Sequence, residues 1–325
     1  MIARATRFLI LRGGAIGDFI VTLPALQMIR DRWPEAYIEL IGYPHVARLA
    51  LQNGLVNEVR SLDQAGIAAF FGRKPSFSAE QVEHIRSFDL IFTWLHDLNG
   101  AVQDNLLLAG ARHVVYGSPL IPDGVPAVEH LVRPLESLAL YTQQPCPRLV
   151  LDADVRAAGQ KVVQQRVGRQ RAWAIHPSSG SPRKNWPLRH FRELADRLTR
   201  DRDVVPLYIL GEADASIQEE LSRDVPPKQL VTGQSLTELA ALLSACDGYV
   251  GNDSGITHLA AAVMQRPVIA LFGPSDARQW APRGAAVNLL QAESGDLADL
   301  SPDHVWATLQ AALSPDRLPP HNENQ

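Results

Sequence analysis

Short apolar runs alternate along the chain with stretches in which apolar residues recur at helical spacing. In the first half, strands are predicted at FLILR, AYIELIGY, FDLIFTWL and RHVVYGS, and helices from Val21 to Trp33 and from Glu129 to Tyr141. Strands that alternate with helices in this way form βαβ units around a parallel sheet. The first half therefore predicts a doubly wound α/β domain.

The same alternation resumes after a proline-rich stretch from Gly117 to Pro147. Strands are predicted at AWAIHP, VVPLYILG, GYVGND and PVIALFGP, and helices at LRHFRELADRLTR, SIQEELSRD, LTELAALLSACD and ITHLAAAVM. This order predicts a second Rossmann-like half. Because ligands of open α/β sheets bind beyond the carboxyl ends of the strands, two such domains predict a central cleft.

The length supports two domains. The chain has 325 residues, more than the roughly 250 at which single hydrophobic cores stop growing. We expect domains at residues 1–150 and 151–313, followed by a polar, proline-containing tail at 314–325 that is disordered.

Composition narrows the class of protein. The net charge of −4 argues against a surface shaped as a whole to hold nucleic acid. Two cysteines far apart in the sequence indicate no disulfide framework and fit a reducing cytosol. No apolar run approaches the roughly 20 residues that span a bilayer. A soluble, cytoplasmic protein is expected.

The first motif follows the first predicted strand, where GGAIGD places Gly13, Gly14 and Gly17 before Asp18. Glycines let the backbone turn tightly and approach a ligand closely. The carboxylate of Asp18 can cap the next helix or act as a catalytic base, and the spacing leaves both interpretations open. The glycine spacing differs from the G-x-G-x-x-G fingerprint, which disfavours a nicotinamide cofactor.

The second motif is HPSSGSPRKNWP, in which a strand ends in serines and a glycine before Arg183 and Lys184. Backbone N–H groups of such a loop, together with a lysine, can bind phosphate oxygens. The alternative is a flexible basic surface loop.

The third motif is GNDSGITHLAAAVM. Ser254 and Gly255 occupy the first turn of a predicted helix and can present N–H groups to an anion. His258 is expected to have a structural role. Together with the FGPSD turn after the next strand, these loops favour a diphosphate ligand. Glu212, after another strand, suits a ribose diol or is a solvated helix-terminal acid.

These segments closely resemble glycosyltransferase family 9, the ADP-heptose:lipopolysaccharide heptosyltransferases, in the family's order and over nearly the whole chain. The resemblance implies a GT-B architecture, two Rossmann-like domains facing a central cleft. The acceptor would bind mainly to the first domain and the nucleotide sugar mainly to the second. It also implies transfer with inversion at the anomeric carbon, with no metal and no cofactor besides the donor substrate.

The resemblance assigns roles residue by residue: Asp18 as catalytic base, Lys184, Ser254 and Gly255 on the donor phosphates, Asp253 on the donor sugar and Glu212 on the nucleoside. From the local sequence alone, we expect Gly13, Gly14, Gly17 and His258 to shape the loops. The region from Gln64 to His84, expected to face the acceptor, has no counterpart that we can place. The acceptor, a lipopolysaccharide core or another glycan, therefore stays open, as does a heptose donor.

Two alternatives keep the fold: a nucleotide-sugar epimerase and a non-catalytic nucleotide-sugar-binding protein. If the acceptor carries lipid, the protein would act peripherally at the inner face of the inner membrane. Basic residues that could contact anionic lipid, or could be scattered surface charge, are Arg4, Arg7, Arg30, Arg32, Arg73 and Lys74.

Overall fold

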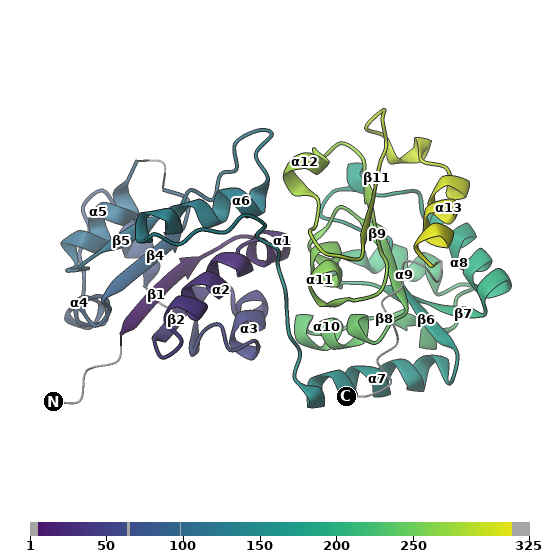
Figure 1. Ribbon diagram of the computed structural model, residues 1–325, viewed down its shortest axis with the longest axis horizontal. Coiled ribbons are helices and arrows are strands. Elements are labelled where there is room, and N and C mark those ends of the chain that lie inside the picture. Colours follow the sequence, from purple (N-terminus) through teal and green to yellow (C-terminus); the bar gives the residue numbers. More distant parts are fainter. Residues whose placement is uncertain (1–5, 64–65, 98, 314–325) are drawn as a thin grey trace. The chain divides into compact units, whose positions relative to one another are not determined.

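The chain forms two compact units, Met1–Pro147 (unit 1) and Arg148–Gln325 (unit 2). The computed structural model describes residues 6–63, 66–97 and 99–313 (Figure 1). The division lies three residues before the expected boundary at 150, and the expected tail at 314–325 lies outside the described residues. Within those ranges, no helix is long and apolar enough to cross a bilayer.

Unit 1 contains a parallel sheet in the order β3-β2-β1-β4-β5 (Figure 1). Its strands are β1 (Arg7–Arg12), β2 (Tyr37–Gly42), β3 (Glu58–Ser61), β4 (Leu90–Trp94) and β5 (Val114–Tyr116). Its helices are α1 (Ile16–Ile20), α2 (Leu23–Arg32), α3 (Pro44–Gln52), α4 (Ala79–Arg86), α5 (Ala101–Leu108) and α6 (Ala127–Val132), with 3₁₀ helices η1 (Ile67–Phe71) and η2 (Arg133–Leu138).

The strand order follows from the connections. Right-handed crossovers place α2 and α3 on one face of the sheet and α4 and α5 on the other. On the second face, Leu9 and Leu11 of β1 pack with Ile85 of α4 and Leu106 of α5. Because both faces are covered, the central strands are apolar on both sides, as the run FLILR predicts.

Unit 2 has a parallel sheet in the order β11-β10-β9-β6-β7-β8. Its strands are β6 (Arg171–His176), β7 (Val204–Ile209), β8 (Leu230–Val231), β9 (Gly248–Asn252), β10 (Val268–Phe272) and β11 (Val287–Gln291). Its helices are α7 (Ala153–Val167), α8 (Leu188–Arg202), α9 (Ala215–Leu221), α10 (Leu236–Ser244), α11 (Gly255–Val263), α12 (Ala277–Trp280) and α13 (Pro302–Ala312), with 3₁₀ helices η3 (Pro182–Lys184), η4 (Glu212–Asp214), η5 (Pro227–Gln229) and η6 (Leu297–Asp299).

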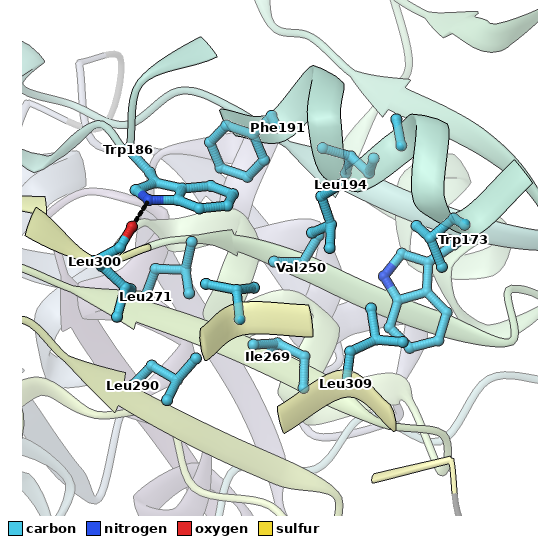
Figure 2. Close-up of a cluster of buried hydrophobic side chains, with 14 of the residues drawn as sticks. Trp173, Trp186, Phe191, Leu194, Val250, Ile269, Leu271, Leu290, Leu300 and Leu309 are labelled. Atoms are coloured by element: carbon cyan, nitrogen blue, oxygen red, sulfur yellow. Dashed lines mark hydrogen bonds between the residues drawn. The ribbon is translucent and has the colours of Figure 1, made fainter. Parts of the chain in front are cut away.

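One face of the unit 2 sheet carries a large apolar core under α8 and α13 (Figure 2). Trp186 and Phe191 pack edge to face with their ring centroids 4.9 Å apart. The Trp186 indole donates a hydrogen bond of 2.8 Å to the Leu300 carbonyl, so its polar atom is satisfied inside the core (Figure 2). The residue that ends the loop after β6 is therefore firmly anchored.

The predicted α/β class with two doubly wound parallel sheets is confirmed, but two element predictions are wrong in detail. Asp18 does not precede a helix; it lies inside α1, which is separate from α2 because Pro24 has no N–H to donate to the carbonyl of Ile20. The predicted helix from Glu129 to Tyr141 instead changes to the 3₁₀ helix η2 at Arg133, since Pro134 likewise interrupts the hydrogen-bond ladder.

Candidate functional site

Of the candidate residues, Asp18 and Lys184 follow the central strand of their sheet, and the others in unit 2 follow the strands that flank the central strand of that unit. In unit 1, β1 pairs with both β2 and β4, and in unit 2, β6 pairs with both β7 and β9. In each sheet, the strand that follows the central strand in sequence lies on one side of it, and a later strand lies on its other side. The strand order therefore reverses at the central strand, and ligands of α/β sheets bind at such topological switch points. Asp18 follows β1, and Lys184 follows β6.

Asp18 is the third residue of α1 and is half-buried. Its Oδ2 accepts a hydrogen bond of 2.9 Å from the backbone N–H of Ala15, so the capping interpretation is confirmed for this oxygen. Its Oδ1 accepts no hydrogen bond from the described residues. One oxygen thus fixes the carboxylate, and the other remains available for a proton.

Gly14 makes room for Asp18. Its φ is +97°, and a Cβ there would lie 2.9 Å from the Cβ of Asp18. At Gly13, by contrast, the nearest side chains would be at 3.8 Å, an ordinary contact. Of these two glycines, Gly14 is the one that the geometry requires.

Gly14→Ala is expected to lower the free energy of unfolding by about 1–3 kcal/mol. The alanine would be strained at a positive φ, and its Cβ would also clash with the Asp18 side chain. Gly124→Ala is the matched control, since Gly124 has φ of +72° and no neighbour within 4 Å of an added Cβ. Chemical denaturation of both variants measures the difference. Equal destabilisation by the two substitutions would show that Gly14 does not accommodate the Asp18 side chain.

Arg12, which the sequence interpretation did not single out, holds α1 in place. Its guanidinium is buried and donates to the Thr22 hydroxyl at 2.9 Å and to the Asp18 carbonyl at 2.7 Å. It also donates to the carbonyl of Trp94 at the end of β4. Burial lowers the pKa of Arg12 to about 10, and the charge of Asp18 opposes this shift. The only sequence signal is a charge at the end of an apolar strand.

In unit 2, Lys184 and Asp253 form an ion pair. The Lys184 ammonium donates to Asp253 Oδ2 at 2.8 Å, joining the loop after β6 to the residue that follows β9. Asp253 is buried, whereas Lys184 is 36% exposed and can reach a ligand. The sequence interpretation assigned these residues separate contacts, and the structure brings them together.

Asn252, the last residue of β9, also joins the end of β9 to the loop after β6, because its side-chain amide bonds to the backbone of that loop. It is fully buried, its Oδ1 accepts from the Trp186 N–H, and its Nδ2 donates to the Pro177 carbonyl. The sequence interpretation noted Asn252 only as a strand end.

Ser254 is the N-cap of α11, which begins at Gly255, whereas the sequence interpretation placed both residues in the first turn of the helix. Its hydroxyl accepts from the Thr257 N–H at 3.3 Å, and the Thr257 hydroxyl is in turn 2.8 Å from the buried Tyr249 hydroxyl. Burial raises the pKa of Tyr249, which keeps this hydroxyl protonated. Because Ser254 uses its side chain as a cap, its anion-binding capacity lies in the backbone N–H groups of the helix start, including that of Gly255. His258 is buried in the same helix.

Glu212 is exposed in η4 after β7. The buried carboxylate of this turn is Asp214, whose Oδ2 accepts from the Gly211 N–H at 2.7 Å. His176, at the end of β6, donates through Nδ1 to the Ile209 carbonyl at 3.0 Å, and burial lowers its pKa despite the nearby charge of Asp214. The turn that was expected to hold a nucleoside thus has an ordered, buried acid two residues after Glu212.

His176 is expected to make stability depend on pH. Its pKa in the folded protein is below the ordinary value near 6.5, so the unfolded chain binds more protons between these two values. The free energy of unfolding should therefore fall as pH decreases below about 6.5, and less steeply in His176→Asn. Denaturation at several pH values measures this slope. His45→Asn, on the exposed surface of α3, is the control, and a His176→Asn slope as steep as the control's would contradict the assignment.

The basic residues considered for membrane contact differ in whether their side chains already bind other parts of unit 1. Arg7 and Arg32 lie over aromatic rings, and Arg30 donates to backbone carbonyls, so these three stabilise unit 1. Arg73 and Lys74 are exposed, and Arg4 lies outside the described residues. In the described part of the chain, no cluster of three or more His, Cys, Asp or Glu side chains is arranged to hold a metal ion.

Comparisons with known proteins identify the family to which the chain is similar. The model of the family described as glycosyltransferase family 9 (heptosyltransferase) matches residues 115–305. Lipooligosaccharide heptosyltransferase 2 of Haemophilus influenzae is 33% identical over 123 residues, which cover 36% of this chain and 35% of that protein. Lipopolysaccharide heptosyltransferase 3 of Escherichia coli K12 is 23% identical over 89% of this chain and 88% of that protein.

Among solved structures, that of E. coli ADP-heptose lipopolysaccharide heptosyltransferase II is similar, with a TM-score of 0.75. The match has 20% identity and covers 94% of this chain and 98% of that chain. At this identity the likeness shows the fold, which is the GT-B fold expected from the sequence.

Proposed function

Because the chain belongs to glycosyltransferase family 9, the heptosyltransferase family, we propose that it transfers a heptose from ADP-heptose to a lipopolysaccharide core or a related glycan. The family resemblance found in the sequence is confirmed by the match to residues 115–305. The named activities of the relatives support the sugar and the acceptor class. The name of the structurally similar E. coli enzyme supports the donor.

The observation that carries the proposal is that each unit has the groups for one half of the reaction at its switch point. In unit 1, Asp18 has a half-buried carboxylate. Its Oδ2 accepts a hydrogen bond from the Ala15 N–H, and its Oδ1 is available to accept a proton. Unit 2 presents a lysine and a helix N-terminus, which suit a diphosphate. A base for the acceptor and a cationic site for the leaving group are the two requirements of nucleotide-sugar transfer.

We propose that unit 2 binds the donor. Lys184 and the N–H groups at Ser254 and Gly255 would contact the diphosphate. Asp253, whose Oδ2 pairs with Lys184, would accept hydrogen bonds from the sugar hydroxyls, and Glu212 would bind the nucleoside. The proximity of Lys184 and Asp253 supports adjacent diphosphate and sugar subsites.

In the proposed reaction, Asp18 removes the proton from an acceptor hydroxyl as its oxygen attacks the anomeric carbon. The new glycosidic bond forms on the face opposite the departing diphosphate, so the configuration inverts. The bond between the anomeric carbon and the diphosphate oxygen breaks, and its electron pair leaves with ADP. Lys184 and the start of α11 stabilise the charge that develops there, a role that a metal ion fills in other transferases.

The location of the reaction is part of the same proposal. An acceptor on the lipopolysaccharide pathway would be met in the cytoplasm at the inner face of the inner membrane. Arg73 and Lys74 are the exposed basic residues of the set that could assist by attraction to anionic lipid.

Calorimetric titration with ADP, UDP and GDP, each with and without EDTA, tests the donor assignment. We expect ADP to bind most tightly, with an affinity that EDTA leaves unchanged. Preference for UDP or GDP would contradict the ADP-heptose donor. An affinity for ADP that EDTA abolishes would contradict the metal-independent mechanism.

A further inference from the structure

A single buried side chain closes the loop that carries Lys184. Asn252 is 0% exposed, and its amide reaches both ends of the loop between Pro177 and Trp186. Its Oδ1 accepts from the Trp186 N–H at 2.9 Å, and its Nδ2 donates to the Pro177 carbonyl at 2.9 Å. A residue of β9 thus fixes the entry and the exit of a loop that follows β6.

The loop is held at further points near the same place. The Trp186 indole is anchored in the core of unit 2 by its bond to Leu300 (Figure 2). Inside the loop, the Ser179 hydroxyl donates to Asn185 Oδ1 at 2.7 Å. The charge of Lys184 is paired with Asp253, the residue next to Asn252. Asn252 and Asp253 therefore hold the backbone and the charged tip of one loop from one strand end.

We infer that Asn252 is a positioning residue for diphosphate binding, which it serves by presetting the loop so that Lys184 faces the ligand. This inference rests on the proposed function, in which Lys184 contacts the donor phosphates. A loop that is already ordered loses little conformational entropy when the ligand binds, and this raises affinity without a new contact. Without Asn252, the N–H of Trp186 and the carbonyl of Pro177 would lose their buried partner.

The chain offers a matched control in unit 1. Asn105 is also buried, and its amide donates to the carbonyls of Phe70 and Gly72 at 2.7 and 2.9 Å. Asn105→Ala thus removes two hydrogen bonds from a buried amide to the end of η1, just as Asn252→Ala removes two, but the segment it affects carries none of the proposed donor residues. The control separates loss of stability from loss of loop position.

The experiment compares hydrogen exchange and ligand binding in the full-length variants. In the ligand-free protein, Asn252→Ala should exchange faster than wild type in a peptide covering 177–186, and Asn105→Ala should not. The ADP affinity of Asn252→Ala should fall about tenfold, whereas that of Asn105→Ala should stay within about twofold at a similar loss of melting temperature.

Asn252→Leu provides a second variant, which keeps roughly the volume of the side chain but makes neither hydrogen bond. It should increase exchange in the same peptide and weaken ADP binding about as much as Asn252→Ala does, because the two variants lose the same hydrogen bonds. Unchanged exchange in both Asn252 variants, or an equal loss of affinity in Asn105→Ala, would overturn the inference.

Inorganic pyrophosphate, titrated in parallel, separates this inference from the proposed donor. If wild type prefers UDP or GDP, the ADP-heptose assignment fails, while weaker pyrophosphate binding by Asn252→Ala still supports the positioning role. Equal pyrophosphate binding by wild type and Asn252→Ala, or no binding by wild type, overturns the positioning role.

Discussion

Asp18→Asn is expected to reduce the turnover of sugar transfer by about 10²–10⁴-fold, the usual contribution of a general base. The amide cannot accept the proton of the acceptor hydroxyl at neutral pH. It keeps the size of the carboxylate and an oxygen that can accept from the Ala15 N–H, so the cap of α1 should persist. The variant should therefore bind ADP as wild type does, because the proposed donor groups lie in unit 2.

Steady-state kinetics with saturating donor and acceptor measure this loss, and calorimetry with ADP checks that the donor site is intact. Gln27→Ala, on the exposed part of α2, serves as a nearby surface control. Transfer by Asp18→Asn at a rate close to that of wild type would remove Asp18 from the catalytic role and leave it as a cap.

Lys184→Ala is expected to weaken ADP binding by about 10- to 100-fold, because it removes the proposed charge-assisted hydrogen bond to the diphosphate. It also leaves the buried Asp253 carboxylate without its cation, beside the place where the negative ligand would bind. Both effects act in the same direction, so the loss should exceed that of an ordinary surface charge.

Arg183→Ala is the matched control, since Arg183 is the exposed neighbour of Lys184 and carries the same charge. It should change ADP affinity by no more than about twofold at physiological salt. Adding Asp253→Asn to Lys184→Ala should recover part of the lost affinity by removing the unpaired carboxylate. If both single variants lose affinity equally, the effect is general electrostatic attraction, and Lys184 has no specific contact.

Much of the fold was predictable because the central strands are buried on both faces. The runs around β1, β6 and β10 are continuously apolar, and that of β2 is interrupted only by Glu39, so their length and composition identify them. The strands that the pattern missed are at or near sheet edges. In β3, all four residues are exposed or half-buried, so no apolar run marks it.

The candidate site residues were predictable where the local sequence alone indicates their chemistry. Asp18, Lys184 and the start of α11 all lie in the segment that leads from an apolar strand into the first turn of the next α-helix, where glycine, serine and charged residues are visible in the sequence. What the sequence could not show is pairing between segments far apart. The Lys184–Asp253 ion pair joins residues 69 positions apart, and the bonds from Asn252 to Trp186 and Pro177 span 66 and 75 positions.

Arg12 illustrates the same limit. A charge at the end of an apolar strand has no determined partner until the topology brings β4 beside β1 and sets Trp94 opposite Arg12. Only then does its role in holding α1, and with it Asp18, become apparent.

The most direct test of the account is a transfer assay with wild-type protein, ADP-heptose and a truncated lipopolysaccharide core, in the presence of EDTA, with products analysed by mass spectrometry and by NMR spectroscopy. The account predicts release of ADP and an acceptor that is heavier by one heptose, with the anomeric configuration inverted relative to the donor. Incubation with donor alone serves as the control. An epimerised donor without acceptor, or an unmodified acceptor across cores of several lengths, would contradict the account.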